Sequence, residues 1–356
     1  MEPIGFGIVG AGWRAEFYLR IARALPGRFA ITGVVVRNPE KRTAFQQAWG
    51  VRVCANADEL LKTSPSFVVT SVSWASNPVL LKEFSHRGVP VLSETPPAPD
   101  LEGLREISAL SKQGAKIQVA EQYWAQPHHQ ACSALIEQGL LGRPTHAQVS
   151  VAHGYHGVSL IRRFLCVGFE LPAISGKRFA APIVAGAGRQ GPPAQEAIRN
   201  SEQDIIFLDW GDRLGVLDFT GDQYFGWIRT NRLLIRGERG EIVNDTVSYL
   251  QDFRTPLAVA LRRDVTGANG NLEGFYLRGI QAGGEWAYCN PFAPAPLSDD
   301  ELAIATCLAR MDEYVRTGRE FYSLAEACQD HYLSLVCQRA VSERREMHAE
   351  PQEWTQ

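Results

Sequence analysis

The sequence lacks several features that would assign it at once to a well-marked class. Its seven cysteines include no Cys-x-x-Cys pair and no metal-binding spacing, so we interpret them as small, mostly buried residues in a reducing compartment. No apolar run reaches 18 residues, and no charged-then-apolar leader precedes the first apolar stretch. These absences predict a cytoplasmic protein that does not span or bind a membrane. G-x-S-x-G and Walker A motifs are also absent.

An excess of charge of one sign is missing too. The chain has 36 Lys and Arg residues against 39 Asp and Glu residues, a formal net charge of −3, which gives no electrostatic case for nucleic acid as a partner. The pair His128-His129 has no third ligand nearby in the sequence, so we expect no metal site. With 356 residues, 45% of them hydrophobic, the chain suits an ordinary globular protein of two domains.

The most informative stretch that is present covers residues 4–15. An apolar run ends in Gly10-Ala11-Gly12-Trp13-Arg14-Ala15, which fits the G-x-G-x-x-G/A pattern of a dinucleotide-binding βαβ unit. Gly10 would permit a tight turn, Gly12 a close approach of the backbone to a pyrophosphate, and Ala15 close packing of the next helix. We predict that residues 10–15 bind a dinucleotide. The alternative is a glycine-rich turn without a ligand.

The end of the second predicted strand bears on the choice of cofactor. An NAD site usually has an acidic residue there, for the ribose 2′-hydroxyl, whereas this sequence has Arg37-Asn38. A guanidinium can pair with a 2′-phosphate, so NADP is the preferred cofactor and NAD a second option. Alternatively, Arg37 stacks on the adenine, and Asn38 is the N-cap of the helix that opens at Pro39.

The order of predicted elements changes along the chain. Strands alternate with helices at first, with strands at 4–10, 31–36, 51–54, 67–72, 90–94 and 116–121 and helices at 13–25, 39–49, 58–63, 77–87 and 100–113. This alternation predicts a doubly wound parallel sheet. Later segments favour extended structure with short turns, at 145–152, 203–210, 213–219, 224–230, 232–236, 246–253, 257–264 and 273–281, which predicts an antiparallel sheet.

Three further segments complete the organisation. Residues 185–200 are rich in Gly and Pro and are interpreted as a loop or an oligomer arm. Capping boxes at Ser298 and Ser323 predict helices near 299–317 and 324–345. We therefore divide the chain into a dinucleotide-binding domain (1–123), an α+β substrate and oligomerisation domain with C-terminal helices (124–345) and a polar tail (346–356).

Several local motifs, in this order and spacing, resemble the glucose–fructose oxidoreductase/inositol dehydrogenase (Gfo/Idh/MocA) family. They are Asn38-Pro39-Glu40-Lys41, Gly88 to Pro96, Pro127 to Gly142, Gly154 to Leu165 and Leu234 to Ile242. The resemblance implies an N-terminal Rossmann domain (α/β) followed by an α+β domain with a large, mostly antiparallel, open-faced sheet. It also implies a nucleotide-binding oxidoreductase that acts on a carbonyl, imine or hydroxyl group of a small metabolite, which could be sugar-like. Assembly into a homodimer or homotetramer is implied as well, with the aromatic segment 224–228 contributing to the interface.

Departures from the family pattern leave other functions open. The lysine of the family's E-K-P motif is replaced by Thr95, and its two acidic positions near the histidine are Ala152 and Ser159, so only His156 of the usual catalytic groups remains. One alternative is a non-catalytic dinucleotide-binding sensor or scaffold. The other is a lyase or glycosidase that uses a tightly bound nicotinamide transiently.

The resemblance assigns the candidate catalytic roles. His156 would transfer a proton, since hydride transfer to or from a carbinol needs a proton partner that titrates near neutral pH. Thr95 or Tyr155 would polarise the substrate oxygen. Without the resemblance, a histidine that opens a helix is interpreted as a capping or packing residue.

The remaining candidates are expected around the same cleft. Glu94 should end the fifth strand and face the nicotinamide ribose, and Ser73 and Trp74 follow the fourth strand, where the family has a loop against the cofactor. Aromatic residues at the domain junction are suited to stacking on a sugar or to interdomain packing. Expected substrate contacts are Tyr123, Trp124 and His153.

Overall fold

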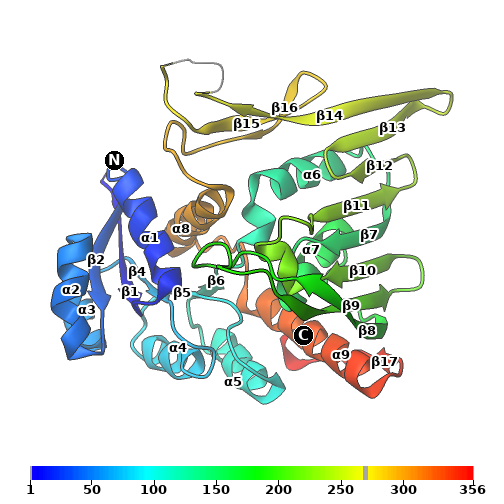
Figure 1. Cartoon of the computed structure of the whole chain (residues 1–356). Coiled ribbons are helices and arrows are strands. Elements are labelled where there is room, and N and C mark those ends of the chain that lie inside the picture. The colour runs from blue at the N-terminus through cyan, green and yellow to red at the C-terminus, as the bar shows by residue number, and fades with distance from the viewer. Residues whose placement is uncertain (1, 268–271, 356) are drawn as a thin grey trace.

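The computed structural model describes residues 2–267 and 272–355, and in these residues two β-sheets lie side by side (Figure 1). The first sheet has the order β3-β2-β1-β4-β5-β6, and all its strand pairs are parallel. Its strands are β1 (Ile4–Val9), β2 (Phe29–Val35), β3 (Val53–Cys54), β4 (Phe67–Thr70), β5 (Val91–Ser93) and β6 (Ile117–Val119). The intervening helices are α1 (Trp13–Ala24), α2 (Pro39–Trp49), α3 (Ala57–Leu61), α4 (Asn77–His86) and α5 (Leu101–Lys112). The predicted doubly wound sheet is thereby confirmed.

The second sheet has eleven strands among the described residues, in the order β16-β15-β14-β13-β12-β11-β7-β10-β9-β8-β17. The strands are β7 (Pro144–Ser150), β8 (Ala173–Val184), β9 (Ile198–Asp209), β10 (Leu214–Phe219), β11 (Arg232–Gly237), β12 (Gly240–Val243), β13 (Thr246–Asp252), β14 (Thr255–Val265), β15 (Leu277–Ala282), β16 (Glu285–Cys289) and β17 (Met347–His348). Only β7 and β10 pair in parallel there. The predicted mostly antiparallel sheet is confirmed.

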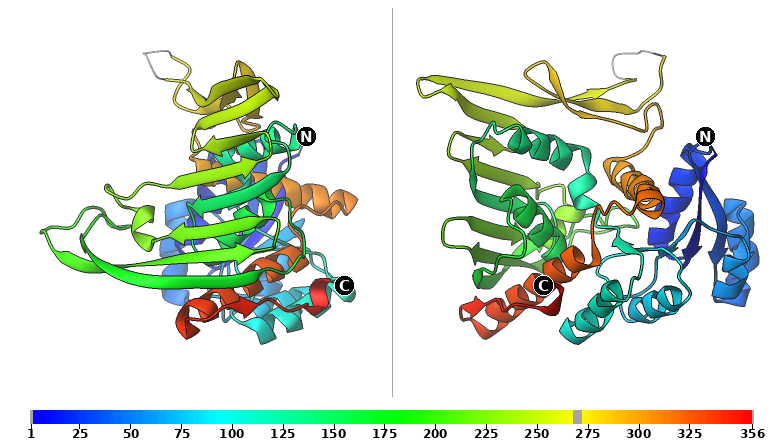
Figure 2. Two further views of the ribbon diagram at one scale, coloured as in Figure 1. Left: turned by 90° about the vertical axis from the view of Figure 1, so that its right-hand side faces the viewer. Right: turned by 180° about the vertical axis from the view of Figure 1, so that it is seen from behind.

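Helices cover one face of the second sheet (Figure 2). They are α6 (Pro127–Glu137), α7 (Gly154–Phe164) and α9 (Leu324–Glu343), with short 3-10 turns η1 (Tyr123–Ala125), η2 (Gly221–Tyr224) and η4 (Glu353–Thr355). The helix α8 (Asp299–Thr317) returns to the first sheet, where its Leu308 shares a buried cluster with Phe6 and Tyr18. In the described part of the chain, no helix combines the length and the apolar character that a membrane span needs.

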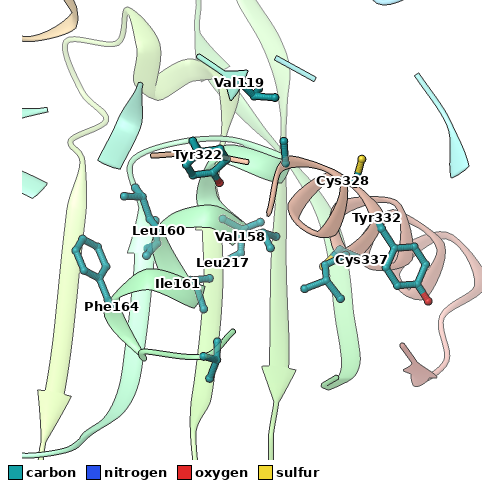
Figure 3. Close-up of a cluster of buried hydrophobic side chains, with 14 of the residues drawn as sticks. Val119, Val158, Leu160, Ile161, Phe164, Leu217, Tyr322, Cys328, Tyr332 and Cys337 are labelled. Carbon is teal, nitrogen blue, oxygen red and sulfur yellow. The ribbon is translucent and has the colours of Figure 1, made fainter. Parts of the chain in front are cut away.

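A buried cluster fixes α7, the helix that carries His156, between the two sheets (Figure 3). Val158 and Ile161 of α7 are fully buried, as are Val119 of β6 and Cys328 of α9 in the same cluster. Leu217 of β10 closes the cluster from the second sheet. Because β6, α7 and α9 share one core, the end of the parallel sheet and the start of α7 are held in one fixed arrangement.

Some predicted elements differ from the structure. Residues 224–230 do not form a strand: they leave η2 as a turn, because the Gln223 amide donates to the carbonyls of Ser150 (2.7 Å) and Thr230 (3.0 Å) and draws the chain back. The strands β8, β16 and β17 were not predicted, and β12 was implied only by the resemblance of Leu234 to Ile242 to a family motif. Residues 346–355 of the expected polar tail dock on the protein, since the buried Trp354 indole donates to Gln329 Oε1 at 2.9 Å.

The predicted helix caps at Ser298 and Ser323 and the predicted unpaired cysteines are found in the structure. Ser298 and Glu301 form a reciprocal capping box. Ser323 caps α9 as predicted, but the Glu326 side chain turns to Arg162 (2.9 Å) instead. All seven cysteines are free thiols, and five of them are buried.

Candidate active site

A cleft of about 970 Å³ runs along the carboxyl ends of the parallel strands and reaches the start of α7. It brings together residues that the sequence had placed in a cofactor or substrate site, namely Gly10, Ala11, Gly12, Trp13, Arg14, Arg37, Asn38, Ser73, Trp74, Glu94, Thr95, Tyr123, His153, Tyr155 and His156. Two candidates lie elsewhere. Ala15 is fully buried beneath the loop, and the Trp124 ring packs under the Arg163 guanidinium (4.9 Å) and does not line the cleft.

Gly10 and Gly12, the two glycines of the G-x-G-x-x-A segment, are suited to their positions for different physical reasons. Gly10 has φ +117°, and a Cβ there would lie 2.0 Å from the carbonyl oxygen of Ser71, so protein packing alone requires glycine. A Cβ on Gly12 would meet no protein atom within 4 Å. Gly12 is also the N-cap of α1 and supplies no side-chain cap, so the first N–H groups of this helix are available to an anion in the cleft.

The tip of β2 presents two cations to the other end of the cleft. Arg37 and Lys41 are exposed and line the cleft, and neither pairs with a carboxylate among the described residues. Arg42 fixes the backbone below them, because its guanidinium donates to the carbonyls of Val36 (2.8 Å) and Arg37 (3.2 Å). Asn38 Oδ1 accepts from Glu40 N at 2.9 Å, so Asn38 is also the N-cap of α2.

The Glu94 carboxylate, directly after β5, is held by two side chains of α1. One carboxylate oxygen accepts from Arg14 Nε (3.1 Å) and the other from Tyr18 Oη (2.5 Å). Burial, together with the charge of Glu94, raises the pKa of Tyr18, so the phenol stays protonated and donates. The sequence analysis missed Tyr18, although its spacing of four residues from Arg14 places the two side chains on one face of α1.

The site has a second buried carboxylate, Glu121, next to His156. His156 Nδ1 lies 2.6 Å from Glu121 Oε2, and the two residues are only 5% and 2% exposed. The other Glu121 oxygen accepts from the backbone N–H of Tyr123 at 3.0 Å. This arrangement assigns the Nδ1 proton to the Glu121 side and leaves Nε2 of His156 facing the cleft, without a hydrogen bond to a described residue.

Glu121 was not among the candidate site residues, yet it provides a carboxylate next to His156, where the family's two acidic positions are replaced by Ala152 and Ser159. Ala152 is fully buried, and the Ser159 hydroxyl is 2.9 Å from Tyr322 Oη, in the core between α7 and α9. The acid comes instead from the end of β6, next to the β5 end that carries Glu94. An acidic residue that follows a buried parallel strand was the available sequence signal.

Aromatic rings surround the His156 imidazole. Tyr155 and Tyr123 lie at ring-centroid distances of 4.3 and 4.5 Å from it, and His153 at 5.1 Å. Tyr155 Oη makes a long hydrogen bond (3.4 Å) to the Thr95 carbonyl. Burial raises the pKa of Tyr155 and of Tyr123, so both phenols are protonated at neutral pH and can donate.

Two other residues of the cleft, Gln122 and Tyr224, were not among the candidate site residues. Gln122 lines it, and its side-chain carbonyl oxygen is buried without a hydrogen-bond partner among the described residues. Tyr224, which hydrogen-bonds His153 Nδ1, forms the wall opposite the parallel sheet. No group of three His, Cys, Asp or Glu side chains suited to a metal ion occurs among residues 2–267 and 272–355.

Comparison with known proteins agrees with the fold of the first sheet and its helices. Residues 4–122 match the model of the Gfo/Idh/MocA family, described as an oxidoreductase family with an NAD-binding Rossmann fold. No curated protein matches the chain by sequence.

Solved structures match nearly the whole chain. An oxidoreductase from Agrobacterium radiobacter, in complex with NAD+, L-tartaric acid and magnesium, has a TM-score of 0.67 at 15% identity, over 97% of this chain and 98% of that one. The WlbA dehydrogenase from Bordetella pertussis, in complex with NADH and UDP-GlcNAcA, has 0.64 at 17% identity, over 99% and 100%. A myo-inositol dehydrogenase from Corynebacterium glutamicum has 0.64 at 17% identity, over 98% and 100%. At these identities the likeness concerns the fold.

Proposed function

Residues 4–122 carry the NAD-binding Rossmann fold of the Gfo/Idh/MocA oxidoreductases, and on this premise we propose that the chain is an NAD(P)-dependent oxidoreductase. Its substrate is a small metabolite with a carbonyl, imine or hydroxyl group. The observation that carries the proposal is the His156–Glu121 pair: a buried imidazole, oriented by a carboxylate, faces the dinucleotide cleft with Nε2.

The residues of the cleft fit a nicotinamide dinucleotide. The open space at Gly12 and the uncapped N-terminus of α1 would accept the pyrophosphate. The unpartnered oxygen of Gln122 would accept a hydrogen bond from the carboxamide group. When bound, the nicotinamide supplies or accepts the hydride.

We further propose that NADP is preferred to NAD. A 2′-phosphate would add two negative charges at the tip of β2, where Arg37 and Lys41 have no carboxylate partner among the described residues. Charge-assisted hydrogen bonds from a guanidinium to phosphate are short, strong and often bidentate. Lys41 adds a second positive charge beside that of Arg37.

In the reductive direction, His156 Nε2 gives a proton to the substrate oxygen as the hydride arrives. Glu121 holds the ring through Nδ1 and stabilises the charged imidazolium. The Thr95 hydroxyl would donate to the same oxygen and polarise it, and so would the protonated Tyr155 phenol once it exchanges its long hydrogen bond to the Thr95 carbonyl for one to the substrate. Oxidation of a hydroxyl group reverses these roles.

The character of the wall around His156 favours an uncharged or sugar-like reacting group. Tyr123 and Tyr155 offer ring faces that suit stacking on a sugar. Thr95 stands where the family commonly has a lysine, so no positive charge is supplied at that position. The structural neighbours include a myo-inositol dehydrogenase and a dehydrogenase in complex with UDP-GlcNAcA. Both support a sugar-like substrate.

We also propose that the protein forms a homodimer or homotetramer through the open face of the second sheet. Ile206 and Leu208 are buried on the helix side, so Phe207 between them faces away, and it is 43% exposed. Val243 follows the buried Ile242 in the same way. Light scattering at micromolar concentration tests the proposal: a particle of two or four chains supports it, and a monomer contradicts it.

The activity is tested by following cofactor absorbance at 340 nm with NADH, NADPH and their oxidised forms. The panel holds sugar acids, nucleotide-linked sugars, polyols, hydroxy acids and the matching ketones. Wild type and His156→Asn are compared, with His348→Asn, on the exposed C-terminal segment, as a matched control. Turnover that only His156→Asn loses supports the proposal. Binding of dinucleotide without turnover by any of the three proteins would favour a sensor.

A further inference from the structure

The long hairpin of β8 and β9 ends in a tight turn that carries Arg189. The two strands pair without a register shift from Ala173↔Asp209 to Val184↔Ile198. Beyond them, the backbones of Gly188 and Gly191 exchange two hydrogen bonds of 3.0 Å each. Only Arg189 and Gln190 lie between these glycines, so the two form a two-residue turn within the connection.

This turn lies against the dinucleotide loop of the same chain (Figure 1). The Arg189 guanidinium stacks on the Trp13 ring at 3.7 Å from its centroid and lies 5.8 Å from the Phe225 ring. Both rings and Arg189 line the cleft. Trp13 is the first residue of α1, directly after Gly12, so the stack stands beside the uncapped helix N-terminus.

Arg189 has an unused charge. Among the described residues it makes no ion pair and no hydrogen bond, whereas Arg14, the other arginine near this loop, is paired with Glu94. Stacking uses the face of a guanidinium and leaves the N–H groups at its edge free to donate. Trp13 therefore orients a cation at the helix N-terminus without neutralising it.

We infer that Arg189 is a clamp for the cofactor diphosphate: the hairpin tip of the second sheet closes over the pyrophosphate that the first sheet binds. This inference rests on the proposed function. The diphosphate would receive N–H groups of α1 from below and the Arg189 edge from above, so both halves of the chain would contribute to cofactor affinity. Because the contact is to the diphosphate, it is the same for NAD and NADP.

The test measures dissociation constants of NADPH, NADH and ADP by titration for wild type and Arg189→Ala. Loss of a charge-assisted contact to phosphate predicts weakening by about 10- to 100-fold, equal for the three ligands because each carries the diphosphate. Stopped-flow displacement should show a faster release of NADPH. Arg189→Lys should recover part of the affinity, and Gln190→Ala, the neighbouring turn residue, should bind as wild type does.

The outcomes separate this inference from the proposed function. Wild-type binding that Arg189→Ala leaves unchanged overturns the clamp and leaves the oxidoreductase standing. A loss for NADPH without a loss for ADP also overturns it, since Arg189 would then act away from the diphosphate. If wild type binds neither dinucleotide, the proposed function fails and the clamp fails with it. Equal melting temperatures of Arg189→Ala and Gln190→Ala exclude unfolding as the cause of weaker binding.

Discussion

Glu94 and Glu121 follow neighbouring parallel strands, and each is engaged by a different part of the chain. Glu94 accepts from Arg14 and Tyr18 of α1, within the first sheet's own layer. Glu121 is bound to His156 of α7, which belongs to the second sheet. One carboxylate therefore stabilises the dinucleotide loop, and the other links the two halves at the point where we expect the reaction.

Replacing His156 separates chemistry from cofactor binding. Its imidazole does not touch the glycine loop, so His156→Asn should bind NADPH as wild type does while kcat falls by roughly 10²–10⁴-fold, as is typical for loss of a general acid or base. Single-turnover kinetics and NADPH titration measure the two quantities. Equal kcat in both proteins would rule out His156 as the proton-transfer group.

Glu121→Gln tests whether Glu121 acts through His156. The amide is similar in size but carries no charge, so it should stabilise the imidazolium less well, and kcat should fall by about 10²-fold or more. The pH–rate profile should also change shape, which a purely structural defect would not produce. If Glu121→Gln and His156→Asn both lower kcat, the double variant should be no slower than His156→Asn. An additive loss would show that the two residues act independently.

The proposed preference for NADP depends on Arg37. Removing its guanidinium should reduce the difference in binding free energy between NADPH and NADH by about 1–3 kcal/mol, and Lys41→Ala should reduce it less, because an ammonium cannot bind bidentately. Titrations at matched ionic strength measure this difference. Equal affinity of the wild type for NADH and NADPH would contradict the proposed preference.

The first sheet could be predicted from the sequence because its determinants are local. Short buried runs, separated by helices with their own caps, specify a parallel sheet. Gly10 could be predicted from its place in the glycine pattern, although the contact that requires it is with the distant carbonyl of Ser71. The second sheet was harder. In β8 the central residues Lys177 to Ala180 are exposed, so the strand lacks the alternation that indicates one buried face.

The site residues that were missed depend on contacts between distant segments. The hydrogen bond from His156 to Glu121 joins residues 35 positions apart, and it exists only because α7 docks at the end of β6. Residues 224–230 have the aromatic and β-branched composition of a strand, but the buried Gln223 amide donates to the carbonyls of Ser150 in β7 and of Thr230 and holds the segment as a turn. The β-strand propensity of the segment could not predict this tertiary contact of the Gln223 amide.

Acid should destabilise the protein through His129. Its ring is buried, with Nδ1 2.6 Å from the carbonyl of Tyr123, and burial lowers its pKa to about 4, from about 6.5 for an exposed histidine. Its contribution to stability is therefore complete above pH 6.5 and is lost as the pH falls towards 4, because the unfolded chain takes up the proton first. Asp330 has the opposite effect on stability. Burial raises its pKa to about 6, so acidification through this pH range stabilises the folded protein through Asp330.

The variant His129→Asn isolates this contribution. Its amide can still donate to the Tyr123 carbonyl but does not titrate, whereas Asp330 titrates in both proteins. From pH 7 to 4.5, wild type should lose about 2–3 kcal/mol of unfolding free energy more than His129→Asn does. Urea denaturation at several pH values measures the two curves. Parallel curves would mean that His129 has the same pKa in the folded and the unfolded chain, which would contradict the lowered pKa of the buried ring.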